Sequence, residues 1–297
     1  MWRGLVMRVR STGWGCKVEL EGKTAVITGG ASGIGLATAR RFAASGVNLV
    51  LGDVERDALE QARDTLRADG ASVHAVVADV SREADVTALR DAALAHFGAV
   101  HIVFNNAGVG GGATIGTPKA VWDWVLGVNL EGVINGINAF VPYFLERDEG
   151  HVVNTASLAG LGGVPGMGAY CASKFAVVGV SEALFHELAL RDAHVGVSVL
   201  CPGFVRTRIA DAARNMPRDL IGDDGPRTGD LDDLAREAVA AGIDPAIVAE
   251  RVAHAVVANE FWILTHERAA LRTTEQRLAW MRGGPAPGIN LRAAAQP

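Results

Sequence analysis

Short apolar runs rich in β-branched residues alternate along the chain with longer stretches of helical period. Strands that alternate with helices predict βαβ units, and runs that are apolar throughout predict strands covered on both faces. The pattern therefore predicts a single α/β domain with a doubly wound, mainly parallel sheet and helices on both faces. The predicted strands are residues 25–27, 47–51, 73–78, 100–104, 151–153 and 195–200, and the helices between them include 57–68 and 84–97.

Several segments interrupt or flank this alternation. Residues 1–18 have little periodicity and are expected to form a loose extension before a main domain at 19–266. Residues 204–242 are rich in charge, Gly and Pro, which predicts a lid or binding loop. A helix to residue 259 and an edge strand at 261–264 follow, and 267–297 are expected to form a last helix and a mobile tail.

Composition narrows the class of protein. The chain has 297 residues, of which 49% are apolar and 21% charged, as in a soluble globular protein. The net charge of −5 argues against nucleic acid or an anionic membrane as partner, and no uninterrupted apolar run reaches roughly 18 residues. Cys16, Cys171 and Cys201 have no metal-like spacing, so we expect free thiols, no metal and a cytoplasmic location.

A glycine-rich turn follows the first predicted strand and precedes a helix rich in Ala and Arg. The turn reads Thr28-Gly29-Gly30-Ala31-Ser32-Gly33-Ile34-Gly35. Glycines let the backbone approach a pyrophosphate, which then binds the free amides at the helix N-terminus. A simple connecting loop is the alternative, but the position between a strand and a helix favours a dinucleotide site.

Asp53 ends the second predicted strand, 18 residues beyond Gly35. A carboxylate there can accept hydrogen bonds from both ribose hydroxyls of adenosine and would repel a 2′-phosphate. Because Val54 rather than a basic residue follows, NAD is favoured over NADP. Arg56 lies close enough to leave NADP open, and a plain turn residue is the alternative reading of Asp53.

Tyr170 and Lys174 are four residues apart in a segment of helical period, so they share one helix face. A neighbouring ammonium lowers the pKa of a tyrosine and makes it a usable acid or base. Such pairs are common by chance, but the chain has only two tyrosines. Ser157 ends the strand 13 residues earlier, where ligands of parallel sheets bind, so its hydroxyl can donate to a substrate oxygen.

Together these motifs resemble the single-domain oxidoreductase branch of the short-chain dehydrogenase/reductase family, over about residues 19–264, which implies a Rossmann-like fold. The resemblance adds catalytic Asn129 to Ser157, Tyr170 and Lys174, and gives Tyr170 and Lys174 a part in holding the cofactor. The other cofactor-binding residues that it implies are Thr28, Gly29, Ser32, Gly33, Ile34, Gly35, Asp53, Asp79, Val80, Asn106, Ala107, Gly108, Pro202, Gly203, Val205 and Thr207.

The resemblance also implies a mechanism. Tyr170 exchanges a proton with the substrate oxygen, Ser157 holds that oxygen, and Lys174 lowers the pKa of Tyr170 and binds the nicotinamide ribose. Asn129 keeps a water in a relay from Lys174 to solvent. The protein is thus expected to transfer a hydride between NAD(H) and a carbon that bears a hydroxyl or carbonyl group.

The expected walls of the substrate site carry little charge. Glycines and apolar residues at 109–112 and 158–167, with Phe204 and Val205, favour a hydrophobic secondary alcohol or ketone. The basic residues of the lid (Arg206, Arg208, Arg214 and Arg218) are interpreted as part of a solvated loop rather than an anion site. Helices at about 121–144 and 168–191 are apolar on more than one face. In the family that the chain resembles such helices pair between subunits, which implies a homodimer or homotetramer, and internal packing is the alternative explanation.

Two alternatives stay open at this point. An NADP-dependent carbonyl or ketoacyl reductase would share the motifs, although Asp53 speaks against it. A non-catalytic protein that uses the fold to sense a nucleotide is the alternative from another class. The complete set of Asn129, Ser157, Tyr170 and Lys174 speaks against that second alternative.

Overall fold

The computed structural model describes residues 19–220 and 230–288. The predicted extension at 1–18, part of the predicted lid (221–229) and the end of the tail (289–297) lie outside the described residues. The strands are β1 (Thr24–Thr28), β2 (Asn48–Asp53), β3 (Val73–Val77), β4 (Ile102–Asn105), β5 (Gly150–Thr155), β6 (Val195–Cys201) and β7 (Trp262–Leu264).

These strands form one seven-stranded sheet in the order β3-β2-β1-β4-β5-β6-β7, and every pair is parallel. The prediction of a doubly wound α/β sheet is confirmed. The order reverses between β1 and β4, so the chain first builds the sheet outward from β1 to β3 and then returns to build the other half. A crevice at the carboxyl ends of the strands is expected at such a reversal.

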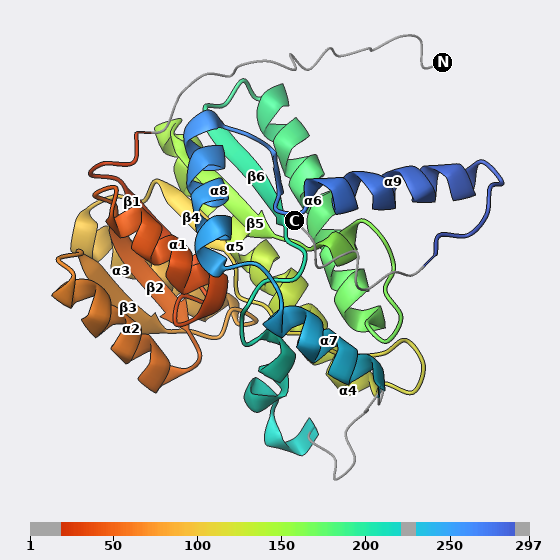
Figure 1. The fold of residues 1–297 in the computed structure, drawn as a ribbon. Helices are drawn as coiled ribbons and strands as arrows, with labels where there is room; N and C mark the ends of the chain where they lie inside the picture. The colour runs from red at the N-terminus through yellow and green to blue at the C-terminus, as the bar shows by residue number, and fades with distance from the viewer. Residues whose placement is uncertain (1–18, 221–229, 289–297) are drawn as a thin grey trace.

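Helices cover both faces of the sheet (Figure 1). One face carries α1 (Gly33–Ala43), α2 (Arg56–Ala68) and α8 (Pro245–Ala258), and the other carries α3 (Glu83–Phe97), α5 (Gly132–Arg147) and α6 (Gly168–Leu190). Side chains of β1 alternate between the two cores, with Ile27 in the first and Val26 in the second. Both residues are fully buried, which explains why the strand is apolar throughout.

Local signals set several helix ends. Gly98 ends α3 in the left-handed conformation (φ 75°), which a glycine adopts without strain. Asp244 begins α8 by accepting a hydrogen bond from the Ala246 amide, and Pro245 occupies the first helical position. These boundaries fall where the sequence pattern changes.

One long apolar helix is interrupted. Helix α4 (Lys119–Leu126) continues through a π-helical turn, η1 (Gly127–Glu131), into α5. By length and composition the run Lys119–Arg147 could cross a membrane. Phe140 and Phe144 of this run are fully buried against the sheet, as in a core helix of a globular domain.

The segments beyond β6 lie over the carboxyl ends of the strands and beside them. The predicted lid contains the short 3-10 helices η3 (Ile209–Asn215) and η4 (Arg218–Leu220), and then α7 (Asp230–Ala240). The predicted edge strand is β7, and the predicted last helix is α9 (Glu267–Met281), which projects from the side of the domain (Figure 1). A short 3-10 helix, η2 (Leu158–Gly160), follows β5.

Candidate active site

The turn between β1 and α1 can be built only with glycine at its critical positions. Gly29 and Gly33 have φ angles of 63° and 54°, which side chains disfavour. A Cβ added to Gly35 would lie 2.1 Å from the carbonyl oxygen of Gly29. The side chain of Ser32 makes no capping bond to α1, which leaves the amides of its first turn for a ligand. This cradle fits the pyrophosphate of a dinucleotide.

Thr28 and Asn106 join the ends of β1 and β4 beneath this turn. The Thr28 hydroxyl oxygen accepts hydrogen bonds from the amides of Asn106 (2.9 Å) and Ala107 (3.1 Å). The Asn106 side chain donates to the Thr28 carbonyl oxygen at 3.0 Å. Thr28 therefore supports the glycine turn from the side away from the cavity, and its hydrogen bonds fix the segment Asn106–Gly108 beside the turn.

Asp53 lies at the end of β2, next to the turn. One carboxylate oxygen accepts from the Ala31 amide and the other from the Glu55 amide, each at 3.0 Å. Burial raises the pKa of Asp53 above its ordinary value, although these two backbone hydrogen bonds oppose the increase. The carboxylate is therefore fixed in direction at the edge of the cavity where adenosine of a bound dinucleotide would lie.

Asp79 and Val80 follow β3 on the same side of the sheet. The Asp79 carboxylate accepts from the Ser81 amide (3.0 Å) and the Ser81 hydroxyl (2.7 Å). Asn135 donates to the Val80 carbonyl oxygen at 2.9 Å, which ties this turn to α5. Hydrogen bonds from the following residue and from α5 therefore fix Asp79 and Val80 in position.

Lys174 is the deepest charged group of the site. Its side chain is 2% exposed, and its Nζ donates to the Thr155 carbonyl oxygen at 2.8 Å. The same Nζ lies 5.6 Å from the centroid of the Tyr170 ring, so the predicted pairing on one face of α6 is present. Burial lowers the pKa of Lys174 to about 8.

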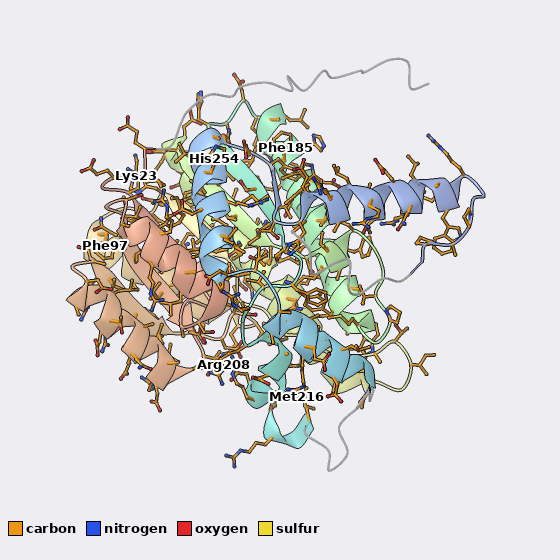
Figure 2. All side chains as sticks on the ribbon, in the orientation of Figure 1. Lys23, Phe97, Phe185, Arg208, Met216 and His254 are labelled. Atoms are coloured by element: carbon orange, nitrogen blue, oxygen red, sulfur yellow. The ribbon has the colours of Figure 1, made fainter. Side chains whose placement is uncertain are left out.

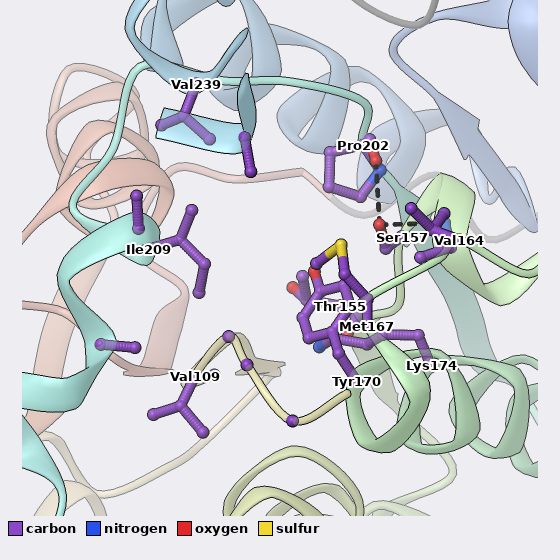
Figure 3. A pocket seen from close by; sticks show the side chains of 18 of the residues that line it. Val109, Thr155, Ser157, Val164, Met167, Tyr170, Lys174, Pro202, Ile209 and Val239 are labelled. Carbon is purple, nitrogen blue, oxygen red and sulfur yellow. Dashed lines mark hydrogen bonds between the residues drawn. The ribbon is translucent and has the colours of Figure 1, made fainter. Parts of the chain in front are cut away.

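Ser157 lies two residues after the end of β5 and lines the same cavity as Tyr170 (Figure 3). Its hydroxyl accepts from the Ala159 amide (3.1 Å) and donates to the Pro202 carbonyl oxygen (3.4 Å). Burial raises the pKa of Tyr170, and a hydrogen bond with Ser157 opposes that increase. The lowering of this pKa by Lys174 stays a prediction for catalysis, because the ammonium bonds to Thr155 in this structure.

Asn129 occupies the π-helical turn and is fully buried. Its side-chain oxygen accepts from the Val109 amide at 2.8 Å, and its amide donates to the Val109 carbonyl oxygen at 2.9 Å and to Ser173 Oγ at 3.1 Å. These bonds join the loop after β4 to α6 behind the cavity. π-helical turns are often found at functional sites because they redirect a side chain within a helix.

The Pro202-Gly203 turn after β6 is fixed by hydrogen bonds to the residues that follow β7. The Gly203 amide donates to Thr265 Oγ1 at 3.3 Å and to His266 Nδ1 at 3.2 Å. A Cβ at Gly203 would lie 2.7 Å from the same imidazole nitrogen, so a larger residue would not fit. Beyond the turn, Thr207 lies against Gly33 and lines the cavity beside the glycine turn.

A single cavity of about 1970 Å³ connects these features. Three predicted site residues do not line it: Thr28 and Gly35 support the turn, and Asn129 lies behind the wall. The predicted residues that line it are Gly29, Ser32, Gly33, Ile34, Asp53, Asp79, Val80, Asn106, Ala107, Gly108, Ser157, Tyr170, Lys174, Pro202, Gly203, Val205 and Thr207. The described residues include no cluster of three His, Cys, Asp or Glu side chains that could hold a metal.

The structure adds residues that the sequence did not indicate. The Thr155 carbonyl oxygen accepts the hydrogen bond of Lys174. In the sequence, its position two residues before Ser157 is the one feature that could have indicated a part in the site. Helix α9 also lines the cavity through Thr273 and Trp280, among others. The acidic side chain of Glu55 bonds to the predicted lid, a contact that only the fold creates.

Comparison with known proteins agrees with the geometry. A family model described as short chain dehydrogenase matches residues 23–218. A solved short chain dehydrogenase/reductase from Burkholderia phymatum, in complex with NAD, is 43% identical with a TM-score of 0.88, covering 92% of this chain and 99% of that one. This neighbour supports NAD, the predicted cofactor.

Two curated relatives are named for their activities. The 3beta-hydroxysteroid dehydrogenase 2 of Eggerthella lenta is 40% identical over 201 residues, which cover 66% of this chain and 75% of the relative. The CLA biosynthesis dehydrogenase/reductase of Lactiplantibacillus plantarum is 31% identical over 255 residues, which cover 84% and 89%. Because the family match spans most of the domain and the motifs lie around one cavity, the chain belongs to the short-chain dehydrogenase family of oxidoreductases.

Proposed function

We propose that this protein is an NAD-dependent dehydrogenase/reductase that acts on a hydrophobic secondary alcohol or the corresponding ketone. The observation that carries the proposal is the convergence of Ser157, Tyr170 and Lys174 on one cavity that also contains the glycine turn. A proton-transfer group and a dinucleotide cradle in the same cavity are what hydride transfer to or from a C–O carbon requires.

Tyr170 is the proposed acid/base. In the oxidation of an alcohol, its phenolate takes the hydroxyl proton while the C–O bond becomes a carbonyl, and in reduction the phenol returns the proton. Ser157 donates a hydrogen bond to the same substrate oxygen, where negative charge develops. Bound NAD supplies the acceptor of the hydride that leaves the carbon.

Lys174 and Asn129 are proposed to support this exchange. The Lys174 ammonium lies 5.6 Å from the Tyr170 ring centroid and stabilises the phenolate electrostatically. Binding of the nicotinamide ribose is the second role proposed for Lys174. Asn129 fixes the loop at Val109 against α6. We propose that it also keeps a water in the proton relay from Lys174 to solvent.

The proposed preference for NAD over NADP rests on the carboxylate of Asp53. Backbone hydrogen bonds fix its carboxylate at the end of β2 beside the glycine turn. Ribose hydroxyls can donate to this carboxylate, and a 2′-phosphate would be repelled by it. Arg56, which the sequence left as a possible phosphate ligand, lies 3.9 Å from Glu60 on exposed α2 and does not line the cavity.

The proposal of a hydrophobic substrate rests on the walls of the cavity that contains Tyr170. Val109, Val164 and Met167 line this cavity (Figure 3), as do Phe204 and, from α9, Trp280. Apolar walls around few polar groups favour an uncharged ligand that is fixed through its C–O group. The two relatives named for hydroxysteroid and CLA reactions are consistent with this class of substrate.

The experiment is a comparison of Tyr170→Phe with Tyr143→Phe, the chain's other tyrosine. Tyr143 lies on α5, does not line the cavity, and its hydroxyl accepts a hydrogen bond from the Val100 amide (3.4 Å). With NAD or NADP and a panel of hydrophobic secondary alcohols, Tyr170→Phe should lose about 1000-fold or more in kcat while NADH still binds. Substantial surviving turnover would contradict the role of Tyr170.

The same assay separates the remaining alternatives. Turnover with NADP alone would identify an NADP-dependent carbonyl or ketoacyl reductase and leave the role of Tyr170 intact. A protein that binds neither cofactor would be better explained as non-catalytic. Homo-oligomerisation through the helices predicted at about 121–144 and 168–191 stays a prediction, which light scattering on the purified protein checks.

A further inference from the structure

Glu55 connects the end of β2 to the segment 204–220. One carboxylate oxygen of Glu55 lies 2.5 Å from Arg214 Nη2 and 2.9 Å from Arg214 Nε, and also accepts from Asn215 Nδ2 at 3.0 Å. The other oxygen lies 3.3 Å from Arg208 Nη1. A single carboxylate thus receives three side chains of a segment more than 150 residues away in the sequence.

This cluster lies at the adenosine end of the cavity. Glu55 donates its amide to the Asp53 carboxylate at 3.0 Å, so the two acidic residues are adjacent. Glu55, Arg208 and Arg214 line the same cavity as Asp53. Figure 2 shows Arg208 on the side of the segment that faces the start of α2. A phosphate on the adenosine ribose would therefore approach both acids and both guanidinium groups.

Glu55 is the ionised acid of this cluster, and the two arginines differ in how many of their N–H donors are already used. Its side chain is 23% exposed, and the hydrogen bonds from Arg214 and Asn215 outweigh burial and lower its pKa, so it is ionised at neutral pH. Arg214 also donates to the carbonyl oxygens of Arg208 and Asp211, at 3.0 and 2.9 Å, and has little capacity left. Among the described residues, the guanidinium of Arg208 has one hydrogen-bond partner, Glu55 at 3.3 Å, which makes Arg208 the freer cation of the two.

We propose that Glu55 is a specificity-determining residue for the cofactor, because it occupies two arginines that would otherwise bind the 2′-phosphate of NADP. Asp53 repels the phosphate, and Glu55 removes the attraction that Arg208 and Arg214 would offer. The inference rests on the proposed NAD preference and deepens it. Arg206 and Arg236 do not take part, since they pair with Asp244 and Asp211.

The test is Glu55→Gln, a change that keeps the size and one acceptor oxygen but removes the charge. Dissociation constants of NADH and NADPH are measured by calorimetry, so no substrate needs to be known. We expect the ratio of the NADPH constant to the NADH constant to fall by about tenfold in the variant. Adding Arg208→Gln and Arg214→Gln to Glu55→Gln should remove most of that change.

Glu60→Gln is the matched control. Glu60 lies on the exposed face of α2, where its contact is Arg56 at 3.9 Å, and it does not line the cavity. It changes the net charge by the same amount, so a general electrostatic effect would appear in both variants. We expect the Glu60→Gln ratio to remain within twofold of the wild-type ratio.

Each outcome decides a different point. A wild-type protein that prefers NADH, with an unchanged ratio in Glu55→Gln, overturns the role of Glu55 and leaves the NAD preference standing. Equal weakening of both cofactors indicates that Glu55 only anchors the segment 204–220, and it also overturns the proposal. A wild-type protein without preference contradicts the proposed NAD preference, whereas a shift toward NADPH in Glu55→Gln still supports Glu55.

Discussion

The buried His151 on β5 makes the free energy of unfolding depend on pH. The side chain is fully buried, and its Nε2 lies 2.8 Å from Ser198 Oγ. Ser198 donates its own proton to the Glu260 carbonyl oxygen at 2.6 Å, so His151 Nε2 carries the hydrogen of the first contact. His151 Nδ1 has no hydrogen-bond partner among the described residues.

The consequence for folding follows from the two pKa values. Burial lowers the pKa of His151 from its ordinary 6.5 to about 4 in the folded protein. Between these values the unfolded chain binds the proton and the folded protein does not, so stability rises with pH. The contribution is complete above pH 6.5 and is lost as the pH falls toward 4. At about 1.4 kcal/mol for each pKa unit, the loss is about 3 kcal/mol.

The measurement is urea unfolding followed by tryptophan fluorescence from pH 7 to pH 4, for wild type and His151→Gln. Glutamine keeps a donor for Ser198 but does not titrate, so the wild-type free energy of unfolding should fall by about 3 kcal/mol more than that of the variant. Histidines 74, 101 and 266 also have lowered pKa values, but they act equally in both proteins. His254→Gln, at an exposed position on α8, is the control. Parallel pH profiles of wild type and His151→Gln would refute this reasoning.

Two other substitutions test the site. Gly35→Ala should weaken NADH binding at least tenfold and destabilise the protein by about 1–3 kcal/mol, because its Cβ would meet the Gly29 carbonyl oxygen at 2.1 Å. Gly163→Ala, whose Cβ would have no described atom within 4 Å, should change neither quantity in calorimetry and urea unfolding, and equal effects of both would contradict the steric argument. Ser157→Ala should lower kcat by about 100- to 1000-fold with NADH binding within twofold of wild type. A proportional loss of NADH affinity would assign Ser157 a structural role instead.

Local pattern was enough to predict most elements and the order of the motifs. The apolar runs became strands because both faces of this sheet are buried, as Val26 and Ile27 of β1 illustrate. The spacing of four between Tyr170 and Lys174 placed both on one face of α6, since that depends only on helix geometry. The glycine turn was also predictable, because its conformation excludes other residues at Gly35.

Contacts between distant segments were decided only by the tertiary structure. The sequence pattern predicted one helix at about 121–144, but it did not indicate the π-helical turn that directs Asn129 toward Val109 and Ser173. Nor did it indicate that the Lys174 ammonium bonds to Thr155.

The ion pairs of Glu55 show the physical reason most clearly. The sequence presented Arg208 and Arg214 as scattered charges of a solvated loop, and the pairing with Glu55 spans more than 150 residues. Periodicity records which face of an element is buried, whereas the partner of a polar side chain depends on which strand ends the sheet order brings together. The sequence therefore determined the elements and the chemistry of the site, and the packing of β1, β2, β4 and β5 decided which side chains act on one another.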